Sequence, residues 1–410
     1  MSLGRLKIAM IAAHSCPVGE LGAKDTGGMS VYIRELAREL SKQGHTVDVY
    51  TRVHDPADPI IDDLGEGARL IHLKAGQEAK INKLEVYSYL PEFTRNLENF
   101  RENNGLNYDL VFSHYWLSGL VGQNLQRRWR MPHVVMFHTL GAVKNAIGIG
   151  EGDPELRIAS EKELIDSCQC VIAATHRSRE EHERYYGAAP AKVSVVPCGV
   201  NMKLFQPVAQ DLARQKLALT DEKVLLFVGR LDPLKGAGRL LEAITYLKKF
   251  ESLRLIIIGG DESSRSEIEN LRQRCAELGI SDKVTFQGTV KQAELPGFYS
   301  AADVCVVPSY YESFGLVPLE ALACGTPVVA ADIGDVKNII RPGKTGYVVG
   351  TNAPENLADG IARVLSKPPR DMESALTVRA SVSRFDWANV AGEIVRELRP
   401  VLDKWMSPVA

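Results

Sequence analysis

The chain lacks the features typical of secreted, membrane-spanning and nucleic-acid-binding proteins. Its seven cysteines are an odd number without a C-x-x-C pair, so we expect reduced core residues rather than metal ligands. No apolar run approaches the length that crosses a bilayer, and the first residues lead into a strand pattern rather than a signal peptide. The formal net charge of -2 provides no basic field for nucleic acid or anionic lipid. These absences predict a cytoplasmic protein with no nucleic-acid partner and no stable membrane insertion.

The chain does contain two successive series of short apolar strands that alternate with helical patterns, and its 410 residues suffice for two domains. The first series predicts strands at residues 6–13, 47–51, 69–73, 110–113, 132–137 and 193–197. The second predicts strands at residues 223–228, 253–258, 284–286, 304–308 and 328–331. This alternation predicts an α/β fold with two doubly wound parallel sheets. A linker near residues 198–210 predicts domains at 1–200 and 201–385.

The stretch at residues 310–326, YYESFGLVPLEALACGT, lies between two strand patterns of the second series. Gly315 allows close approach of the backbone to a ligand, and the helical pattern that follows it offers free amides and a positive dipole end. This arrangement predicts a pyrophosphate seat. Glu312 before the helix and Glu320 within it would accept hydrogen bonds from sugar hydroxyls on both sides of a diphosphate. The alternative interpretation is an ordinary loop carboxylate and an ordinary helix-face carboxylate.

Cations and glycines follow other predicted strands. Residues 229–236, GRLDPLKG, place Arg230 and Lys235 in the loop after the first strand of the second series, where both suit phosphate oxygens. Gly27 and Gly28 end the first long loop of the chain, at residues 14–30, and allow a phosphate close to the backbone. The alternatives are a solvated turn for the cations and a plain helix cap for the glycines.

His138 and Thr139 follow directly on the predicted strand at residues 132–137. Ligands collect at the carboxyl ends of strands in open α/β sheets, so these two residues lie where chemistry is expected. A single histidine at a strand end is also a common packing residue, and position alone does not separate the two interpretations.

The E-x7-E spacing of Glu312 and Glu320, with Phe314-Gly315 between them, resembles the signature of retaining glycosyltransferases of family four. HYWLSG at residues 114–119 and HTLGAVKN at 138–145 resemble, within that family, the mycothiol-pathway inositol-phosphate N-acetylglucosaminyltransferases and, more loosely, sucrose-phosphate synthases. The resemblance implies the GT-B fold, with two Rossmann-like domains facing a central cleft. It also implies that a final helix, at about 386–410, packs back on the first domain.

The resemblance implies roles for individual residues around the donor. The expected donor-binding residues are Gly27, Gly28, Arg230, Lys235, Gly259, Glu312, Phe314, Gly315, Leu316 and Glu320. The expected catalytic residues are His138, Arg230, Lys235 and Glu312. The chain has no D-x-D sequence, the usual diphosphate-metal signature of the other large transferase fold. Two cations and helix amides can stabilise the leaving diphosphate instead, so no metal and no cofactor are expected.

The resemblance also implies an acceptor site made of Lys83, Tyr115, Thr139 and Arg157. Two cations and two hydroxyls suit a phosphate dianion, because it needs charge and several donors. The alternative for Lys83 and Arg157 is ordinary solvated surface. Ser30 replaces an asparagine of the related GGMNVY sequence, which argues against inositol phosphate itself as the acceptor.

The predicted activity is transfer of a hexose or N-acetylhexosamine from a UDP-sugar to a hydroxyl of a small phosphorylated sugar or cyclitol, with retention. The family implies a front-face displacement in which the leaving phosphate takes the acceptor proton, and a possible homodimer. The alternatives are a transferase for a lipid-linked or polysaccharide acceptor, a nucleotide-sugar 2-epimerase of the same fold, and a non-catalytic nucleotide-sugar-binding protein. The sequence does not separate glucose from N-acetylglucosamine.

Overall fold

The first half of the chain forms an eight-stranded sheet in the computed structural model, which describes residues 4–19, 27–150 and 152–406. The strand order is β3-β4-β2-β1-β5-β6-β7-β8, and every pairing is parallel except that of β3 with β4. The order reverses between β1 and β5, so their carboxyl ends border a crevice. The strands are β1 (Lys7–Ile11), β2 (Thr46–Arg52), β3 (Ile61–Gly65), β4 (Ala68–Leu73), β5 (Leu110–His114), β6 (His133–Met136), β7 (Cys170–Ala173) and β8 (Val193–Val195).

Helices cover both faces of this sheet. Alternate residues of β1 are fully buried on opposite sides, with Ile8 and Met10 in one apolar cluster and Ala9 and Ile11 in another. Burial on both faces explains why the strand reads as a continuous apolar run. The helices are α1 (Gly28–Lys42), α2 (Lys83–Asn103), α3 (Trp116–Trp129), α4 (Gly141–Ile147), α5 (Glu155–Ser167) and α6 (His176–Tyr186).

The second half forms a six-stranded parallel sheet in the order β11-β10-β9-β12-β13-β14. Its order reverses between β9 and β12, which brings the loops that follow these two strands together. The strands are β9 (Lys223–Val228), β10 (Leu253–Ile258), β11 (Val284–Gly288), β12 (Val304–Val307), β13 (Val328–Ala331) and β14 (Gly346–Val349). The helices are α7 (Gln210–Lys216), α8 (Ala237–Ile244), α9 (Arg265–Glu277), α10 (Leu295–Ala301), α11 (Leu316–Ala323), α12 (Val336–Ile339), α13 (Pro354–Leu365) and α14 (Met372–Ala380).

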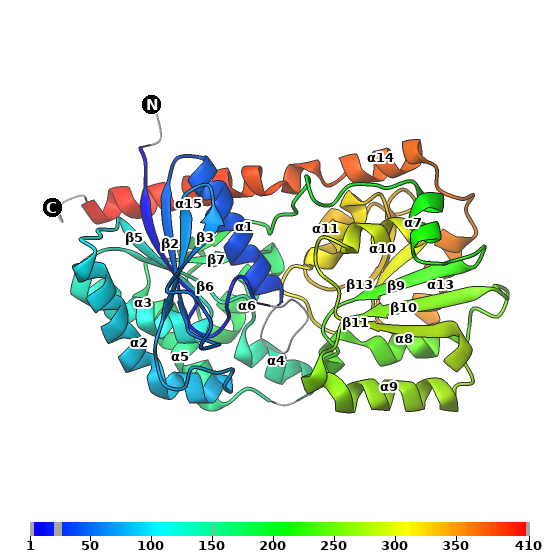
Figure 1. Cartoon of the computed structure of the whole chain (residues 1–410), viewed down its shortest axis with the longest axis horizontal. Helices are drawn as coiled ribbons and strands as arrows, with labels where there is room; N and C mark the ends of the chain where they lie inside the picture. Colours follow the sequence, from blue (N-terminus) through cyan, green and yellow to red (C-terminus); the bar gives the residue numbers. More distant parts are fainter. Residues whose placement is uncertain (1–3, 20–26, 151, 407–410) are drawn as a thin grey trace.

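The last helix, α15 (Trp387–Met406), lies over the first half of the molecule and packs against α1 (Figure 1). The ring of Trp387 meets that of Tyr32 edge-on at 5.3 Å, and the Gln43 amide donates to the Ala388 carbonyl at 2.8 Å. Val200 pairs with Asp386 in an isolated bridge, so the two passages of the chain between the halves run together. The domain limits at 200 and 385 stay a prediction.

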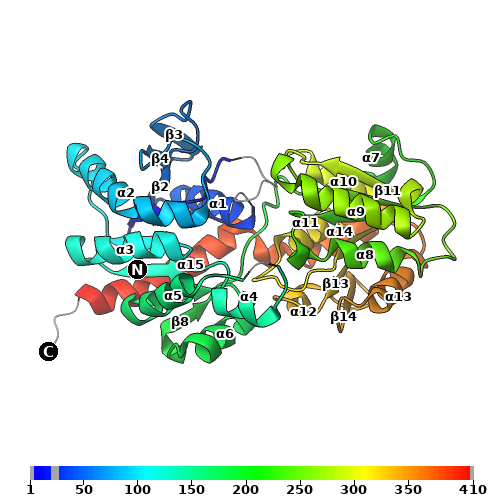
Figure 2. The same cartoon turned by 90° about the horizontal axis from the view of Figure 1, so that it is seen from below.

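The two doubly wound sheets predicted from the sequence are confirmed. One detail differs, because β3 at the edge of the first sheet runs antiparallel to β4. Helices α1 and α4 lie on the side of the first half that faces the second half (Figure 2). In the part of the chain that the structure describes, no helix combines the length and the apolarity needed to cross a membrane.

Replacing Trp387 by alanine tests how much α15 stabilises the first half. The indole is 2% exposed, so Trp387→Ala should lower the free energy of unfolding by about 3–5 kcal/mol, mainly through the cavity it leaves. The matched control is Trp405→Ala in the same helix, because Trp405 is 41% exposed and should cost about 1 kcal/mol or less. Thermal unfolding of both variants checks this. Equal midpoints would show that α15 contributes little to the first half.

Candidate active site

The two halves touch where the first turn of α1 meets the loops of the second sheet. A Cβ on Gly28 would lie 3.4 Å from the Leu316 side chain, and one on Gly27 would lie 3.8 Å from the Arg230 side chain. The Arg34 guanidinium also donates to the Gln292 amide across the same boundary at 2.5 Å. Part of the predicted glycine loop, residues 20–26, lies outside the described residues. Gly27 and Gly28 thus lie next to two residues expected to hold the donor.

On the side of the second half, an ion pair joins the loop after β9 to the loop after β12. The Lys235 ammonium lies 2.6 Å from the Glu312 carboxylate, which also accepts from the Ser309 hydroxyl at 3.0 Å. The Arg230 guanidinium lies 3.8 Å from the Asp232 carboxylate in the same region. The reversal of strand order therefore brings together the cations and the carboxylate expected at the donor.

Gly315 caps the N-terminus of α11 with φ 104°, a backbone angle that favours glycine. No side chain of the described residues caps this helix, so its first amides keep their donors for a ligand. Glu320, one turn further, accepts from the Tyr299 hydroxyl at 2.7 Å, and its burial raises its pKa to about 7. The Phe314 side chain packs on Phe385 in the core, so only its backbone can meet a ligand.

Gly259, predicted to line the nucleotide, is also required by packing. Its φ is 132°, and a Cβ there would lie 1.8 Å from the Gly229 carbonyl oxygen. The two strand ends approach so closely that only glycine fits. This packing gives a structural reason for the residue beside its expected role at the donor.

His138 follows β6 and hydrogen-bonds to a second histidine that the sequence analysis did not single out. Its Nε2 lies 3.0 Å from Nδ1 of His114, the last residue of β5. His138 has φ 61°, an uncommon angle for a residue with a side chain and one often found at functional sites. Burial lowers the pKa of His138 to about 3 and holds that of His114 well below its usual value. Both rings are therefore neutral near pH 7.

The four residues expected at the acceptor lie close together, linked through the Tyr115 ring and Arg157. The Lys83 ammonium lies 6.0 Å and the Arg157 guanidinium 4.7 Å from the centroid of the Tyr115 ring. The Arg157 guanidinium also donates to the Thr139 hydroxyl at 3.0 Å and to its carbonyl at 2.7 Å. Tyr115 itself has φ 77°, so a second residue with left-handed backbone lies at a strand end facing this region.

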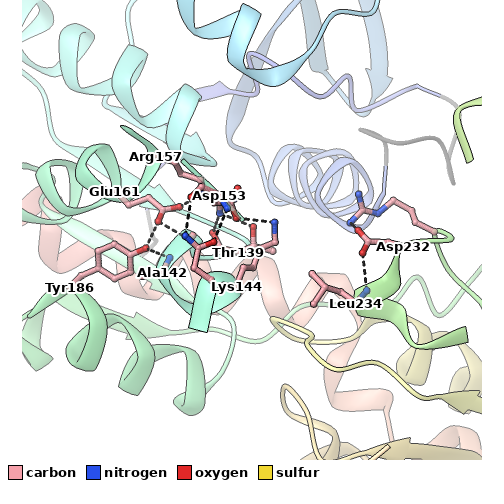
Figure 3. Close-up of polar contacts among 12 residues, drawn as sticks. Thr139, Ala142, Lys144, Asp153, Arg157, Glu161, Tyr186, Asp232 and Leu234 are labelled. Carbon is pink, nitrogen blue, oxygen red and sulfur yellow. Dashed lines mark hydrogen bonds and ion pairs between the residues drawn. The ribbon is translucent and has the colours of Figure 1, made fainter. Parts of the chain in front are cut away.

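Arg157 is 2% exposed and is held by two carboxylates that the sequence analysis missed. Its Nε donates to Glu161 at 2.7 Å and its Nη1 to Asp153 at 2.8 Å (Figure 3). Glu161 also accepts from the Tyr186 hydroxyl, and the Lys144 ammonium lies 2.9 Å from Asp153. Asp153, Arg157 and Glu161 are spaced four residues apart, so the alternating charges at this spacing were the signal that could have found them.

His14, which follows β1, is another residue that the sequence analysis did not single out. Its ring lies 4.4 Å from that of Tyr115, and its buried Nδ1 has no hydrogen-bond partner among the described residues. Burial lowers its pKa well below the usual value, with contributions from Lys83 and Arg157. No sequence signal marked it beyond its place after a strand.

A cavity of about 540 Å³ lies outside this region, between α8, α9 and α13. Its two arginines, Arg239 and Arg274, both form ion pairs with Glu242. The size of the cavity alone therefore does not mark it as the active site.

Two family models match nearly the whole chain. Residues 26–204 match glycosyltransferase family 4, and residues 209–380 match the group 1 glycosyl transferases. D-inositol 3-phosphate glycosyltransferase 2 of Catenulispora acidiphila is 38% identical over 94% of this chain and 92% of its own. The corresponding enzyme of Corynebacterium glutamicum is 35% identical over 95% of both chains.

Solved structures agree with these matches. Sucrose-phosphate synthase from Thermosynechococcus elongatus is similar to this chain with a TM-score of 0.87 and 34% identity, over 98% of this chain and 100% of that one. Anabaena HepE in complex with UDP-glucose shares the fold, with a TM-score of 0.75 and 20% identity over 97% of this chain and all of its own. The chain therefore belongs to glycosyltransferase family 4 and is a glycosyltransferase with the GT-B fold.

Proposed function

We propose that this enzyme transfers a hexose or N-acetylhexosamine from a UDP-sugar to a hydroxyl of a small phosphorylated sugar or cyclitol, with retention and without a metal. The observation that carries the proposal is that Lys83 and Arg157 both lie against the Tyr115 ring, while Arg157 also donates to the Thr139 hydroxyl. Two cations and two hydroxyls from separate segments suit a phosphate dianion. The names of two relatives support the proposal, because one is a D-inositol 3-phosphate glycosyltransferase and the other a sucrose-phosphate synthase.

The donor would lie against the second half of the molecule. Charge that develops on the leaving diphosphate would be stabilised by Arg230, Lys235 and the free amides at the start of α11. Glu312 would accept hydrogen bonds from the transferred sugar, and Glu320 from the ribose. The UDP-glucose complex of HepE supports a uridine nucleotide.

His138 would bond the donor sugar as a hydrogen-bond donor. The buried Nε2 of His114 has no hydrogen-bond partner among the described residues, and an unpaired acceptor costs less than an unpaired N–H. We infer that His114 carries its proton on Nδ1 and donates it to Nε2 of His138. His138 then carries its own proton on Nδ1, which is the nitrogen left for a ligand. A ring with a pKa of about 3 is a weak base, so the leaving phosphate would take the acceptor proton.

We also propose roles for the two domains, an oligomeric state and a location in the cell. The first domain, 1–200, would bind the acceptor, and the second, 201–385, the nucleotide sugar. A homodimer would follow the common symmetry of soluble oligomers. All seven cysteines are buried and without a disulfide, which supports a cytoplasmic location.

Release of UDP decides both the donor and the acceptor class. We expect release from UDP-glucose or UDP-N-acetylglucosamine only with small phosphorylated polyols, with at least tenfold less release for their dephosphorylated forms. Addition of EDTA should leave the rate unchanged. Equal rates with both forms would overturn the phosphate site, and loss of activity with EDTA would overturn metal independence.

Lys235→Ala tests the donor site. Loss of this cation should lower kcat by about a hundredfold to a thousandfold, because its charge acts on the leaving diphosphate. Lys249→Ala is the matched control, since this exposed lysine precedes the start of β10, at the opposite edge of the sheet from Lys235, and its ammonium contacts the Ser366 hydroxyl and the Phe250 ring. Steady-state kinetics of both variants provide the comparison. A kcat close to that of the wild type would remove Lys235 from the mechanism.

Two variants of His114 test whether it positions His138. His114→Phe removes the hydrogen bond and should lower kcat by roughly tenfold to a hundredfold with little change in KM. His114→Asn keeps a polar group near Nδ1 and should restore most of this loss. His133→Asn, at another buried histidine of the same sheet, controls for general damage to the core. Equal losses in the two His114 variants would contradict a positioning role.

A further inference from the structure

Lys144 and Asn145 belong to the HTLGAVKN sequence but have no role in the proposed function so far. In the structure both hold Asp153, which lies between α4 and α5. The side-chain amide of Asn145 donates to the Asp153 backbone carbonyl at 2.9 Å, and the Asp153 N–H donates back to the side-chain oxygen Oδ1 of Asn145 at 2.7 Å. The Lys144 ammonium lies 2.9 Å from the Asp153 carboxylate. These contacts fix the position of a carboxylate rather than of a ligand.

The Asp153 carboxylate lies where an acceptor phosphate would be expected. One oxygen accepts from Arg157 at 2.8 Å and the other pairs with Lys144, so it bridges two cations as a phosphate would (Figure 3). Burial alone would raise the pKa of Asp153, but the charges of Arg157 and Lys144 outweigh it and lower the pKa. The group is therefore an anion at neutral pH.

The other contacts of Arg157 use most of its hydrogen-bond donors, so few remain for a second anion. Its Nε donates to Glu161 and its Nη2 to Thr139, while the Tyr115 ring covers one face at 4.7 Å. With Asp153 on Nη1, all three nitrogen atoms of the guanidinium are engaged. A phosphate can form the two-pronged contact that arginine favours only if one of these partners leaves. Glu161 is fully buried, whereas Asp153 is 14% exposed and lies in a loop.

We propose that Asp153 is a specificity-determining residue that occupies the position of the acceptor phosphate and gives it up to the phosphorylated acceptor. The inference rests on the proposed function, because it requires that Arg157 binds a phosphate. It adds a competitor built into the chain, whose effective concentration is of millimolar order or higher. Free inorganic phosphate therefore binds only weakly against this competitor, whereas an acceptor whose ring also contacts the cleft displaces it more readily.

The loop that carries Asp153 has the composition for this exchange. Gly148 and Gly150 have φ angles of 70° and 77°, and a Cβ on either would meet no described atom within 4 Å. Gly152 directly precedes Asp153. Glycines make a change of backbone conformation cheap, so this loop can adjust when Asp153 leaves Arg157.

Asp153→Asn separates this role from a merely structural one. The variant keeps the shape of the side chain but removes the competing charge, so the affinity for inorganic phosphate should rise roughly tenfold, and the KM of the phosphorylated acceptor should fall by a similar factor. Calorimetric titration with inorganic phosphate measures the first, and UDP release the second. The matched control is Asp166→Asn in α5, whose carboxylate is 64% exposed and should change neither value by more than about twofold.

A second variant keeps every charge in place. Asn145→Ala removes the hydrogen bonds that seat Asp153, so the competitor is weaker and phosphate affinity should rise about threefold. If Asp153 instead only orients Arg157, both variants should bind phosphate more weakly than the wild type, which would overturn the proposal. Unchanged affinity in Asp153→Asn would overturn it as well.

Failure of the proposed function gives a different result from failure of this inference. If the wild type uses dephosphorylated acceptors equally well, the proposal that the acceptor is phosphorylated is wrong. The titration of the two variants with inorganic phosphate still decides whether Asp153 competes with phosphate for Arg157.

Discussion

Cations gathered in a largely buried cleft repel one another and lose hydration, and the arrangement of this site depends on how that cost is offset. In the structure each of several cations expected to meet phosphate lies next to a carboxylate of the chain. Arg157 pairs with Glu161 and Asp153, and Lys235 pairs with Glu312. The enzyme therefore has a charge-balanced cleft before any substrate arrives. A substrate anion binds in exchange for contacts already made, so its net affinity is smaller than the number of cations suggests.

Backbone strain at two strand ends serves the same site. Tyr115 after β5 and His138 after β6 both have positive φ angles, which cost of order 1–3 kcal/mol for residues with side chains. Such angles persist only where the surrounding packing fixes them. Here the hydroxyphenyl ring of Tyr115 lies against Arg157, and the imidazole of His138 bonds to His114. The two sheets supply the rigidity that holds these conformations.

The fold was largely predictable from the sequence because strands buried on both faces form unbroken apolar runs. β3 lacks this signal, because it contains two aspartates and lies at an exposed edge. β7 and β14 are short runs of four residues that the sequence analysis did not single out. β3 runs antiparallel to β4 because the connection between them is short. A pattern of apolar residues does not reveal the direction of a strand.

The sequence indicated candidate site residues where short sequences carry backbone requirements, as at Gly315, or resemble a known family, as at Arg230 and Lys235. Asp153, Glu161 and His114 were not found, because their importance comes from contacts between side chains that the sequence does not show. His114 reads as the end of an apolar strand until β6 places His138 beside it. The charge spacing of Asp153, Arg157 and Glu161 was visible, but the same spacing occurs on many exposed helices.

A substrate would affect the two ion pairs differently. The carboxylate of the Lys235–Glu312 pair can stay in the cleft, whereas that of the Arg157–Asp153 pair would have to leave. Glu312 is expected to remain at the site, because it can turn its oxygens from Lys235 to the hydroxyls of the transferred sugar while the diphosphate takes its place on the cation. Asp153 has no such second partner apart from Lys144, which the acceptor phosphate would also attract. Binding of the donor therefore rearranges contacts within the cleft, whereas binding of the acceptor removes a group from it. Since glycine-rich backbone is found beside Asp153 and not beside Glu312, the sequence around each carboxylate fits the movement that its substrate demands.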